Sequence, residues 1–594
     1  MPHRREPAET LLEGGPILTL DPKRPRVDAA AMRGNTIVAL GTARSVRRAV
    51  GAGARRIDLG GRCLLPAFVD HHVHMLNIGF ALANERRGKT LFLDLADTPS
   101  EEEIAERTTR RATEMGEARW VTGSGWSQNG WKVPLLPTHH RLTQAAPRNP
   151  TLLARLDVHS AWVNAAALEA ARIGADTADP PGGSILRLDD GTPSGMLIDR
   201  AYEAMLAETP RPTDDVVKEA FRLAANSLAT RGFTRAFDAG FLEFPGLLSL
   251  KVDQERYLEL LLEEDAREPL PLHLHLMVMA PTDLAEKILR DRERYRRLSP
   301  RIGVTHLKLH ADGVLGSRGA LLSHGYHDAP CAGLHRLEPE EMREWIGRGL
   351  DVGLDIAIHA IGDLANTQVL DAYEGALRAR PGMDPRRLRI EHFSYASRRD
   401  MERAARMGVV LAVQPGFVAP DAEGHTMEDV RLGRDKAARA YAFGDLHALG
   451  ARMAGSTDDY TFVPNAIQNF FAAATRRTPQ PGHDARWHPE QRLSRNESLR
   501  LLTRWHRPGG GEPEPGVLTE GGPANLVVLS GDPLAVAEED ILSLRVCATF
   551  REGRRTFDDG SIREPKLRPV RRRRPLPPRV TMPKNRKHRG GSKT

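Results

Sequence analysis

The chain has 594 residues and a mass of 65.6 kDa, too much for one ordinary core, so we expect a large protein of enzyme size. Hydrophobic residues make up 40% and charged residues 27%, which excludes wholesale disorder. No apolar run approaches the ~20 residues of a membrane-spanning helix, the N-terminus lacks a secretory signal and the three cysteines form no CxxC pair. We therefore expect a cytoplasmic protein with no membrane partner.

The net charge of +7 is concentrated at the C-terminal end. Residues 561–594 hold 13 Lys and Arg and one acid, Glu564, a balance of +12, so the remaining residues carry −5. A Pro-rich run of like charge predicts a disordered basic tail, which we place at 559–594. Such a tail can bind polyanions weakly through phosphate contacts. A solvated tail without a partner is favoured, and no specific nucleic-acid partner is predicted.

Both ends of the chain read as short strands separated by turn residues. Gly34-Asn35 near the N-terminus and Glu552-Gly553 near the C-terminus are typical of hairpin turns. We expect residues 8–62 and 515–558 to pair into one small composite β-sandwich domain.

The sequence between these ends alternates apolar runs with segments that have the residue pattern of helices. Residues 213–231 have helical spacing, with Thr213 as a cap and Gly232 as a stop. The apolar runs are 64–70, 233–237, 272–279, 302–309, 354–359, 388–393, 408–413 and 451–455. Eight alternating β and α units predict an α/β fold with a (β/α)8 barrel, assigned to residues 63–80 and 206–514.

One connection in this barrel is far too long. The first two runs start 169 residues apart, whereas a barrel unit takes ~31 residues. An α/β insertion at 81–205 therefore follows the first strand. Its aromatic and Gly-rich segments, such as WVTGSGWSQNGW, are typical of a lobe that covers the active site.

The first barrel run ends in a His-x-His pair, His72 and His74. Residues i and i+2 of a strand point the same way, so both imidazoles can face one metal ion. His71 points to the other face and is structural, as is Asp70 unless it supports a ligand. Such a pair alone is weak evidence for a metal site, since His273 and His275 form a second pair that we interpret as ordinary strand residues without a metal.

Further ligand-type residues fall where other runs end. They are His359, His392 and Asp458, with Lys308 inside an apolar run where a lone ammonium is costly. Residues at the carboxyl ends of barrel strands share one site, so these groups predict a centre for one or two divalent ions, with zinc the first candidate. The alternatives are hydrogen-bonded core histidines and a Lys308 that snorkels or pairs with Asp312.

Ten ordered motifs, from about residue 8 to 558, carry a family resemblance. They are LPAFVDHHVH, GSGWSQNGW, DVHSAWVN, PPGGSILRLDDGTPSG, KLHADGVLGSR, IAIHAIGD, RIEHFS, AVQPGF, GSTDD and PANLVVLSGDPL. The chain resembles the amidohydrolase superfamily, in its long-chain branch of amidohydrolase 3 type that includes N-substituted formamide deformylases. The resemblance implies a distorted (β/α)8 barrel, a β-sandwich from both chain ends and an insertion over the active-site mouth.

The resemblance also implies roles for particular residues. The metal ligands are His72, His74, His359, His392 and Asp458, together with Lys308 as a carboxylated lysine that bridges two ions. Asp458 is also the catalytic general base and then acid for a water that attacks an amide.

This chain departs from the family pattern at four places. Ala67 replaces a usual glycine, His71 a small residue and His310 an aromatic residue, and GSTDD carries two aspartates. The catalytic register could therefore move from Asp458 to Asp459.

Substrate contacts are predicted at five further positions: Trp126, His159, Asp312, Arg318 and Gln414. For Asp312, Arg318 and Trp126 the alternatives are turn formation, a surface charge and core packing. An apolar, aromatic lid favours an N-acyl or N-substituted amide as the small-molecule substrate.

The predicted function is metal-dependent hydrolysis of a non-peptide C–N bond by activated water. Three alternatives stay open on the same site: a cyclic amide, a deaminated ring or an ester. A ligand-binding or regulatory homologue without turnover is a further alternative. A metallo-β-lactamase-like hydrolase is disfavoured, because HHVHMLN lacks the Asp-His pair expected after His-x-His. Homo-oligomerisation is also left open.

Overall fold

The computed structural model describes residues 9–51, 53–96, 98–157, 159–241, 254–421, 423–458, 465–479, 484–504, 506, 508–509 and 516–563. The basic tail that we expect at 559–594 lies outside the described residues from 564 onward, and so does Asp459. None of the described helices combines the length and hydrophobicity needed to cross a bilayer.

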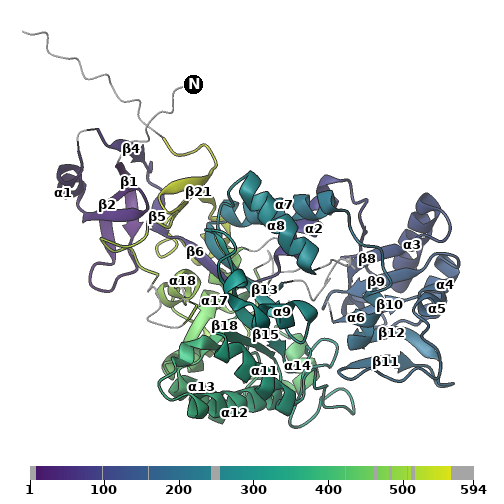
Figure 1. The fold of residues 1–594 in the computed structure, drawn as a ribbon. Coiled ribbons are helices and arrows are strands. Elements are labelled where there is room, and N and C mark those ends of the chain that lie inside the picture. Colours follow the sequence, from purple (N-terminus) through teal and green to yellow (C-terminus); the bar gives the residue numbers. More distant parts are fainter. Residues whose placement is uncertain are drawn as a thin grey trace, which may run out of the picture.

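Eight parallel strands form the central sheet, in the spatial order β19-β18-β17-β16-β15-β14-β13-β6 (Figure 1). Their bounds are β6 Phe68–Val73, β13 Phe233–Phe241, β14 His273–Met279, β15 Ile302–His310, β16 Asp355–Ala360, β17 Leu388–His392, β18 Val410–Val413 and β19 Arg452–Gly455. Each strand starts within four residues of the first residue of one of the eight predicted apolar runs. The fold is a distorted (β/α)8 barrel, as the alternating pattern predicts.

The two end strands of this order meet just beyond their hydrogen-bonded ladder. The backbone N–H of Asp458, three residues after β19, donates to the carbonyl oxygen of His72 in β6 at 2.9 Å. The Asp70 carboxylate accepts two further hydrogen bonds from Thr457, one from the backbone N–H at 3.0 Å and one from the hydroxyl at 2.6 Å. The barrel is therefore nearly closed, and its seam lies beside the predicted metal ligands.

Helices surround the strands. They are α2 Met75–Arg86, α7 Asp214–Thr230, α8 Gln254–Arg267, α9 Asp283–Arg290, α10 Arg292–Arg296, α11 Pro339–Asp351, α12 Asp363–Ala379, α13 Arg398–Met407, α14 Met427–Leu432, α15 Arg434–Ala437, α16 Phe443–Ala448, α17 Ala466–Thr475 and α18 Arg495–Thr503. The predicted helix at 213–231 is α7, with Thr213 as its N-cap and Gly232 just after it at φ 88°.

Helix α2 matters for the site because His74 is its N-cap residue. It packs closely on α7 at Gly79, where a Cβ atom would lie 2.0 Å from the carbonyl oxygen of Ala220. Only glycine permits this approach, so the α2–α7 contact fixes the start of α2 and with it His74.

The two chain ends form a second sheet (Figure 1). Leu12, Leu64, Leu526 and Val528 lie in its core. Its strands are β1 Thr10–Leu18, β2 Arg26–Arg33, β3 Thr36–Gly41, β4 Arg55–Asp58, β5 Cys63–Pro66, β20 Leu526–Leu529, β21 Val546–Arg551 and β22 Arg554–Asp558, with helix α1 Ala43–Ala49 beside them. Gly34-Asn35 joins β2 to β3 and Glu552-Gly553 joins β21 to β22, so both hairpin predictions are confirmed.

The prediction of one barrel strand at 64–70 is wrong in its bounds. The apolar run is divided at Ala67: β5 pairs with β1 and β20 in the terminal sheet, and only β6 belongs to the barrel. Because both sheets bury their strands, an apolar run alone cannot show where the chain passes from one sheet to the other.

A third sheet of six strands stands on the other side of the barrel, in the order β11-β12-β10-β9-β8-β7 (Figure 1). Its strands are β7 Leu93–Asp94, β8 Val121–Trp126, β9 Thr151–Arg155, β10 Ser160–Val163, β11 Gly183–Arg187 and β12 Pro193–Asp199. Helices α3 Glu101–Met115, α4 His139–Ala145, α5 Ala165–Ala170 and α6 Arg200–Leu206 accompany them. These elements all lie in the long stretch between β6 and β13, where the strand spacing predicts an inserted lobe.

Candidate metal centre

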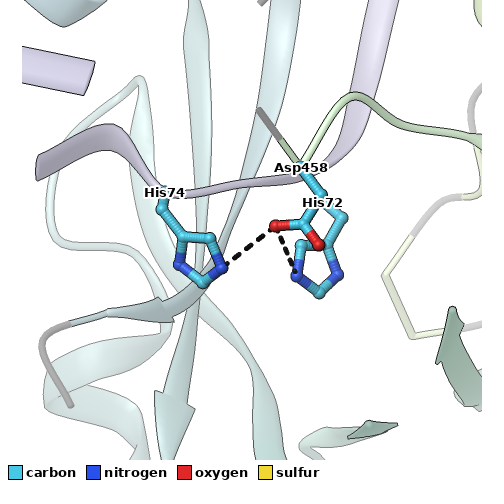
Figure 2. A group of neighbouring side chains, drawn as sticks. All are labelled: His72, His74 and Asp458. Carbon is cyan, nitrogen blue, oxygen red and sulfur yellow. Dashed lines mark ion pairs between the residues drawn. The ribbon is translucent and has the colours of Figure 1, made fainter. Parts of the chain in front are cut away.

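Two imidazoles meet one carboxylate at the seam of the barrel (Figure 2). Nε2 of His74 lies 3.2 Å and Nε2 of His72 lies 3.5 Å from the same oxygen, Oδ1 of Asp458. His72 is near the end of β6 and His74 follows it, so the strand and the start of α2 aim both rings at the segment after β19. Among the described residues, these three form the one group of His, Cys, Asp or Glu side chains with metal-binding spacing.

The other three predicted ligands lie around the same point. Nδ1 of His392 is 3.5 Å from Oδ2 of Asp458, and its ring centroid is 4.8 Å from that of His72 and 4.5 Å from that of His359. Lys308 is buried, and the charges of Glu391 and Asp458 act on its amine. All six side chains line one cavity with a volume of about 50 Å³. The structure therefore brings together residues that are up to 386 positions apart in the chain.

The hydrogen bonds of His72 test whether a cation fits here. Its Nδ1–H donates to Glu391 Oε2, so in the neutral ring Nε2 carries a lone pair. This nitrogen lies 3.5 Å from Asp458 Oδ1, a buried oxygen that His74 Nε2 also approaches to 3.2 Å. Two electron-rich atoms at this separation repel each other, and a cation between them would replace that repulsion with attraction. Imidazole nitrogens and a carboxylate oxygen are the ligands that zinc and similar divalent ions take, so the residues fit such an ion.

Local backbone strain accompanies the site. Asp458 has φ 43° and His392 has φ 74°, in the left-handed region that side chains with a Cβ seldom adopt. Asp70 supports the seam by accepting bonds from the N–H groups of His72 and Thr457. Strained residues of this kind persist where the surrounding structure holds them, and they cluster at functional sites.

Burial and neighbouring charges set the protonation states. Burial lowers the pKa of His72 to about 4 and that of His392 to about 3, so both rings are neutral at pH 7. Burial alone would raise the pKa of Asp458, but the three imidazoles around it hold the pKa below its usual range. Burial also lowers the pKa of Lys308 to about 8. Neutral imidazoles and an ionised carboxylate are the forms that bind metal.

Two of the five predicted substrate contacts lie at this centre. His159 comes from the turn between β9 and β10 of the inserted lobe and lines the cavity. Gln414 is buried, and its side-chain oxygen accepts a bond from His392 Nδ1 at 3.0 Å while its amide donates to Ser456 Oγ at 2.9 Å. Gln414 therefore orients His392, a predicted ligand, and does not line the cavity.

The other three lie outside the cavity lining. Asp312 accepts bonds from the N–H groups of Leu321, Ile361 and Gly362 and so ties two loops together, although its Oδ1 is 3.6 Å from His359 Nε2. Arg318 pairs with Asp328 at 2.8 Å. Trp126 is fully buried in the inserted lobe, where its ring packs on Trp131 and Trp162.

Several site residues were not predicted from the sequence. The cavity is also lined by Asn77, Asp157, His310, Val314, Ile361 and Phe417. Glu391, which fixes His72, stands inside the buried strand β17 directly before His392. A charged side chain inside an apolar run was the signal that singled out Lys308, and the same signal applies to Glu391. Asn77 and Phe417 show no comparable sequence signal.

Comparison with known proteins gives a family match. A model described as the amidohydrolase family matches residues 55–557. YtcJ of Bacillus subtilis strain 168 is 29% identical over 556 residues, which cover 93% of this chain and 99% of YtcJ. The N-substituted formamide deformylase of Arthrobacter pascens is 25% identical over 90% of this chain and 96% of its own length. An uncharacterised metal-dependent hydrolase from Pyrococcus furiosus superposes with a TM-score of 0.63 and 26% identity, covering 89% of this chain and all of its own.

Proposed function

The chain belongs to the amidohydrolase family, and from this premise we propose that it is a metal-dependent hydrolase that cleaves a non-peptide C–N bond, the amide of a small molecule. The observation that carries the proposal is the approach of His72 Nε2 and His74 Nε2 to one buried oxygen of Asp458. The likeness to a metal-dependent hydrolase of Pyrococcus furiosus supports it.

The proposed ligands of one or two divalent ions, with zinc the first candidate, are His72, His74, His359, His392, Asp458 and Lys308. A carbamate on Lys308 would turn a buried amine into an anionic ligand, which agrees with its place in the cavity wall. An ion bound here would polarise the amide carbonyl and lower the pKa of a water from 15.7 towards ~7.

The protein side chains supply orientation and proton transfer. Glu391 and Gln414 hold the rings of His72 and His392 through their Nδ1 atoms. Asp458, ionised at neutral pH, is placed to take a proton from the attacking water and to return it to the leaving amine. Glu391, Gln414 and Asp458 are all buried, which strengthens their hydrogen bonds and charges.

The size of the cavity bears on the substrate. About 50 Å³ is well below the ~300 Å³ or more of a pocket that encloses a drug-sized ligand. A cavity of this volume favours a small acyl group next to the ligands, and Asp157 and His159 in its wall leave the inserted lobe to contact the N-substituent. We propose an N-substituted amide with a short acyl group, which agrees with the name of the Arthrobacter pascens relative, an N-substituted formamide deformylase.

We also propose a cytoplasmic location. All three cysteines, Cys63, Cys331 and Cys547, are free thiols, as a reducing compartment permits.

The test combines metal analysis with a substrate panel. Purified protein should contain zinc, manganese or iron, and should hydrolyse N-alkyl formamides faster than matched cyclic amides, aminated rings or formate esters. His72→Ala should lose both metal and turnover. His273→Ala is the matched control, because it belongs to the second His-x-His pair and instead pairs with Glu552 at 3.1 Å. Protein that binds no divalent metal, or that turns over none of the panel, would overturn the proposal.

A further inference from the structure

Asn77 is a polar side chain in the wall of the candidate metal cavity that the proposed mechanism does not use. It lies in the first turn of α2, three residues after His74, and residues three apart share one face of a helix. Both residues line the cavity. The close packing of α2 on α7 at Gly79 fixes this turn. The helix therefore holds a side-chain amide beside a predicted metal ligand at a defined position.

The burial of Asn77 makes its amide unusual. The residue is 4% exposed, and a buried amide costs free energy unless it is hydrogen-bonded. All five of the other buried asparagines in the described segments donate through Nδ2 to a backbone carbonyl oxygen; they are Asn84, Asn149, Asn164, Asn366 and Asn469. Within the part of the chain that the structure describes, the Asn77 amide makes no such bond.

Asn84 shows how a structural asparagine behaves on the same face of α2. It lies seven residues after Asn77, which is two turns along the helix. Its Oδ1 accepts from the N–H groups of Leu91 at 2.9 Å and Phe92 at 3.3 Å, and its Nδ2 donates to the carbonyl oxygen of Phe92 at 3.1 Å. Asn84 thus ties the end of α2 to the segment that follows. The amide of Asn77 has no comparable task in the described structure and remains for a molecule bound in the cavity.

The charges of the cavity indicate which end of this amide meets a substrate. The carboxylates of Asp157 and Asp458 stand in the same wall. Ionised carboxylates accept hydrogen bonds and repel the partial negative charge of a carbonyl oxygen. The Nδ2 group of Asn77 carries two hydrogens and attracts such an oxygen. The amide group of Asn77 is therefore suited to hold the carbonyl side of a bound amide.

We propose that Asn77 is a further catalytic residue, whose Nδ2–H donates to the oxygen of the scissile carbonyl and to the oxyanion that forms from it. The inference rests on the proposed amide hydrolysis. Addition of water to the carbonyl carbon moves the π electron pair onto this oxygen. The pair returns when the C–N bond breaks, and the proton of the water passes through Asp458 to the leaving amine. Because the hydrogen bond is strongest while the oxygen carries the charge, Asn77 accelerates turnover more than it tightens substrate binding.

The experiment measures steady-state kinetics of Asn77→Leu on an N-alkyl formamide, with the metal content of each sample determined by elemental analysis. Leucine is a good helix former but has no donor. kcat should fall about 10²- to 10³-fold, the usual effect of removing one oxyanion donor, with a smaller change in KM. Asn77→Ala, which cannot crowd the cavity, should show the same loss and serves if Asn77→Leu does not fold. Wild-type turnover in these variants at equal metal content would overturn the inference.

Inhibitor binding separates a catalytic role from a disturbed site. An alkyl phosphinate has an anionic, tetrahedral centre that imitates the oxyanion, whereas the product amine has no carbonyl oxygen. Asn77→Leu should raise the inhibition constant of the phosphinate by about the factor lost in kcat/KM and leave that of the amine unchanged. Equal weakening of both inhibitors would overturn the inference, because a disturbed site weakens every ligand.

Asn84→Ala is the matched control on the same helix. It should lower the unfolding temperature, because three hydrogen bonds are lost, and should leave kcat and both inhibition constants at their wild-type values. Asn77→Leu should instead lower kcat without a comparable loss of stability. A wild-type enzyme that hydrolyses no amide would overturn the proposed function and this inference with it. An active wild type matched by Asn77→Leu would overturn this inference alone.

Discussion

Glu391 and His72, 319 positions apart in the chain, share a hydrogen bond inside the barrel. Arg389 donates to the other oxygen of the same carboxylate at 2.5 Å. Burial alone would raise the pKa of Glu391, but Arg389 and His72 hold this pKa well below its usual range. Because the carboxylate stays ionised, it keeps the hydrogen on Nδ1 of His72 and leaves Nε2 available to the cation that we propose.

We therefore predict that Glu391→Gln weakens metal binding about 10- to 100-fold, the usual effect of losing a group that orients a ligand. The dissociation constant is measured by competition with a chromogenic chelator. Glu428→Gln is the control, since Glu428 is equally buried but accepts its bond from Tyr441 away from the cavity. Equal affinities in wild type and Glu391→Gln would contradict the role assigned to Glu391.

The barrel could be predicted from the sequence because its strands are buried on both faces. Strands of this kind read as continuous apolar runs, and eight of them occur in the right order. His72, His359, His392 and Asp458 stand at or just after the carboxyl ends of such runs, where any barrel brings side chains together. The gathering of the candidate ligands thus follows from strand order and position alone.

Other features depend on tertiary contacts that no local pattern records. The division of the first run at Ala67 depends on the pairing of β5 with β20, more than 450 residues later in the chain. Trp126 and His159 both belong to the inserted lobe, yet one packs in its core and the other enters the cavity. The docking of the lobe on the barrel separates them, and spacing within the sequence carries no information about it.

Asp458→Asn should reduce kcat by about 10²- to 10⁴-fold with a small change in KM, because an amide cannot accept and return the proton of the attacking water. Steady-state kinetics with elemental analysis of the same samples distinguish this effect from loss of metal. The neighbouring variant Asp459→Asn should keep wild-type turnover, since Asp458 already occupies the position facing His72 and His74. An active Asp458→Asn enzyme beside an inactive Asp459→Asn enzyme would reverse the assignment.

Lys308 makes metal loading sensitive to carbon dioxide if its amine becomes a carbamate. Metal-free protein reconstituted in CO2-free buffer should bind fewer ions per chain than protein reconstituted with bicarbonate, as elemental analysis would show. Lys308→Met should lose this response. Lys287→Met should keep it, because Lys287 is a surface residue paired with Glu255. Identical stoichiometry for wild type with and without bicarbonate would exclude the carbamate.

The interior of the barrel below the site makes stability depend on pH. His275 in β14 stacks on Phe237 with ring centroids 4.6 Å apart, and burial lowers its pKa to about 3. Between pH 6.5 and 3 the unfolded chain binds a proton on this ring that the folded protein does not bind. The free energy of unfolding therefore falls as the pH falls through this window, by about 1.4 kcal/mol per pH unit from this residue.

His275→Phe removes this proton while keeping the ring on Phe237, so the variant should lose less stability than wild type between pH 7 and pH 4. Thermal unfolding at matched pH values measures the difference, with both proteins in the same metal-free buffer. His140→Gln should follow wild type, because His140 is exposed. A wild-type pH profile in His275→Phe would show that the ring is protonated in the folded protein as readily as in the unfolded chain, and that burial does not control its charge.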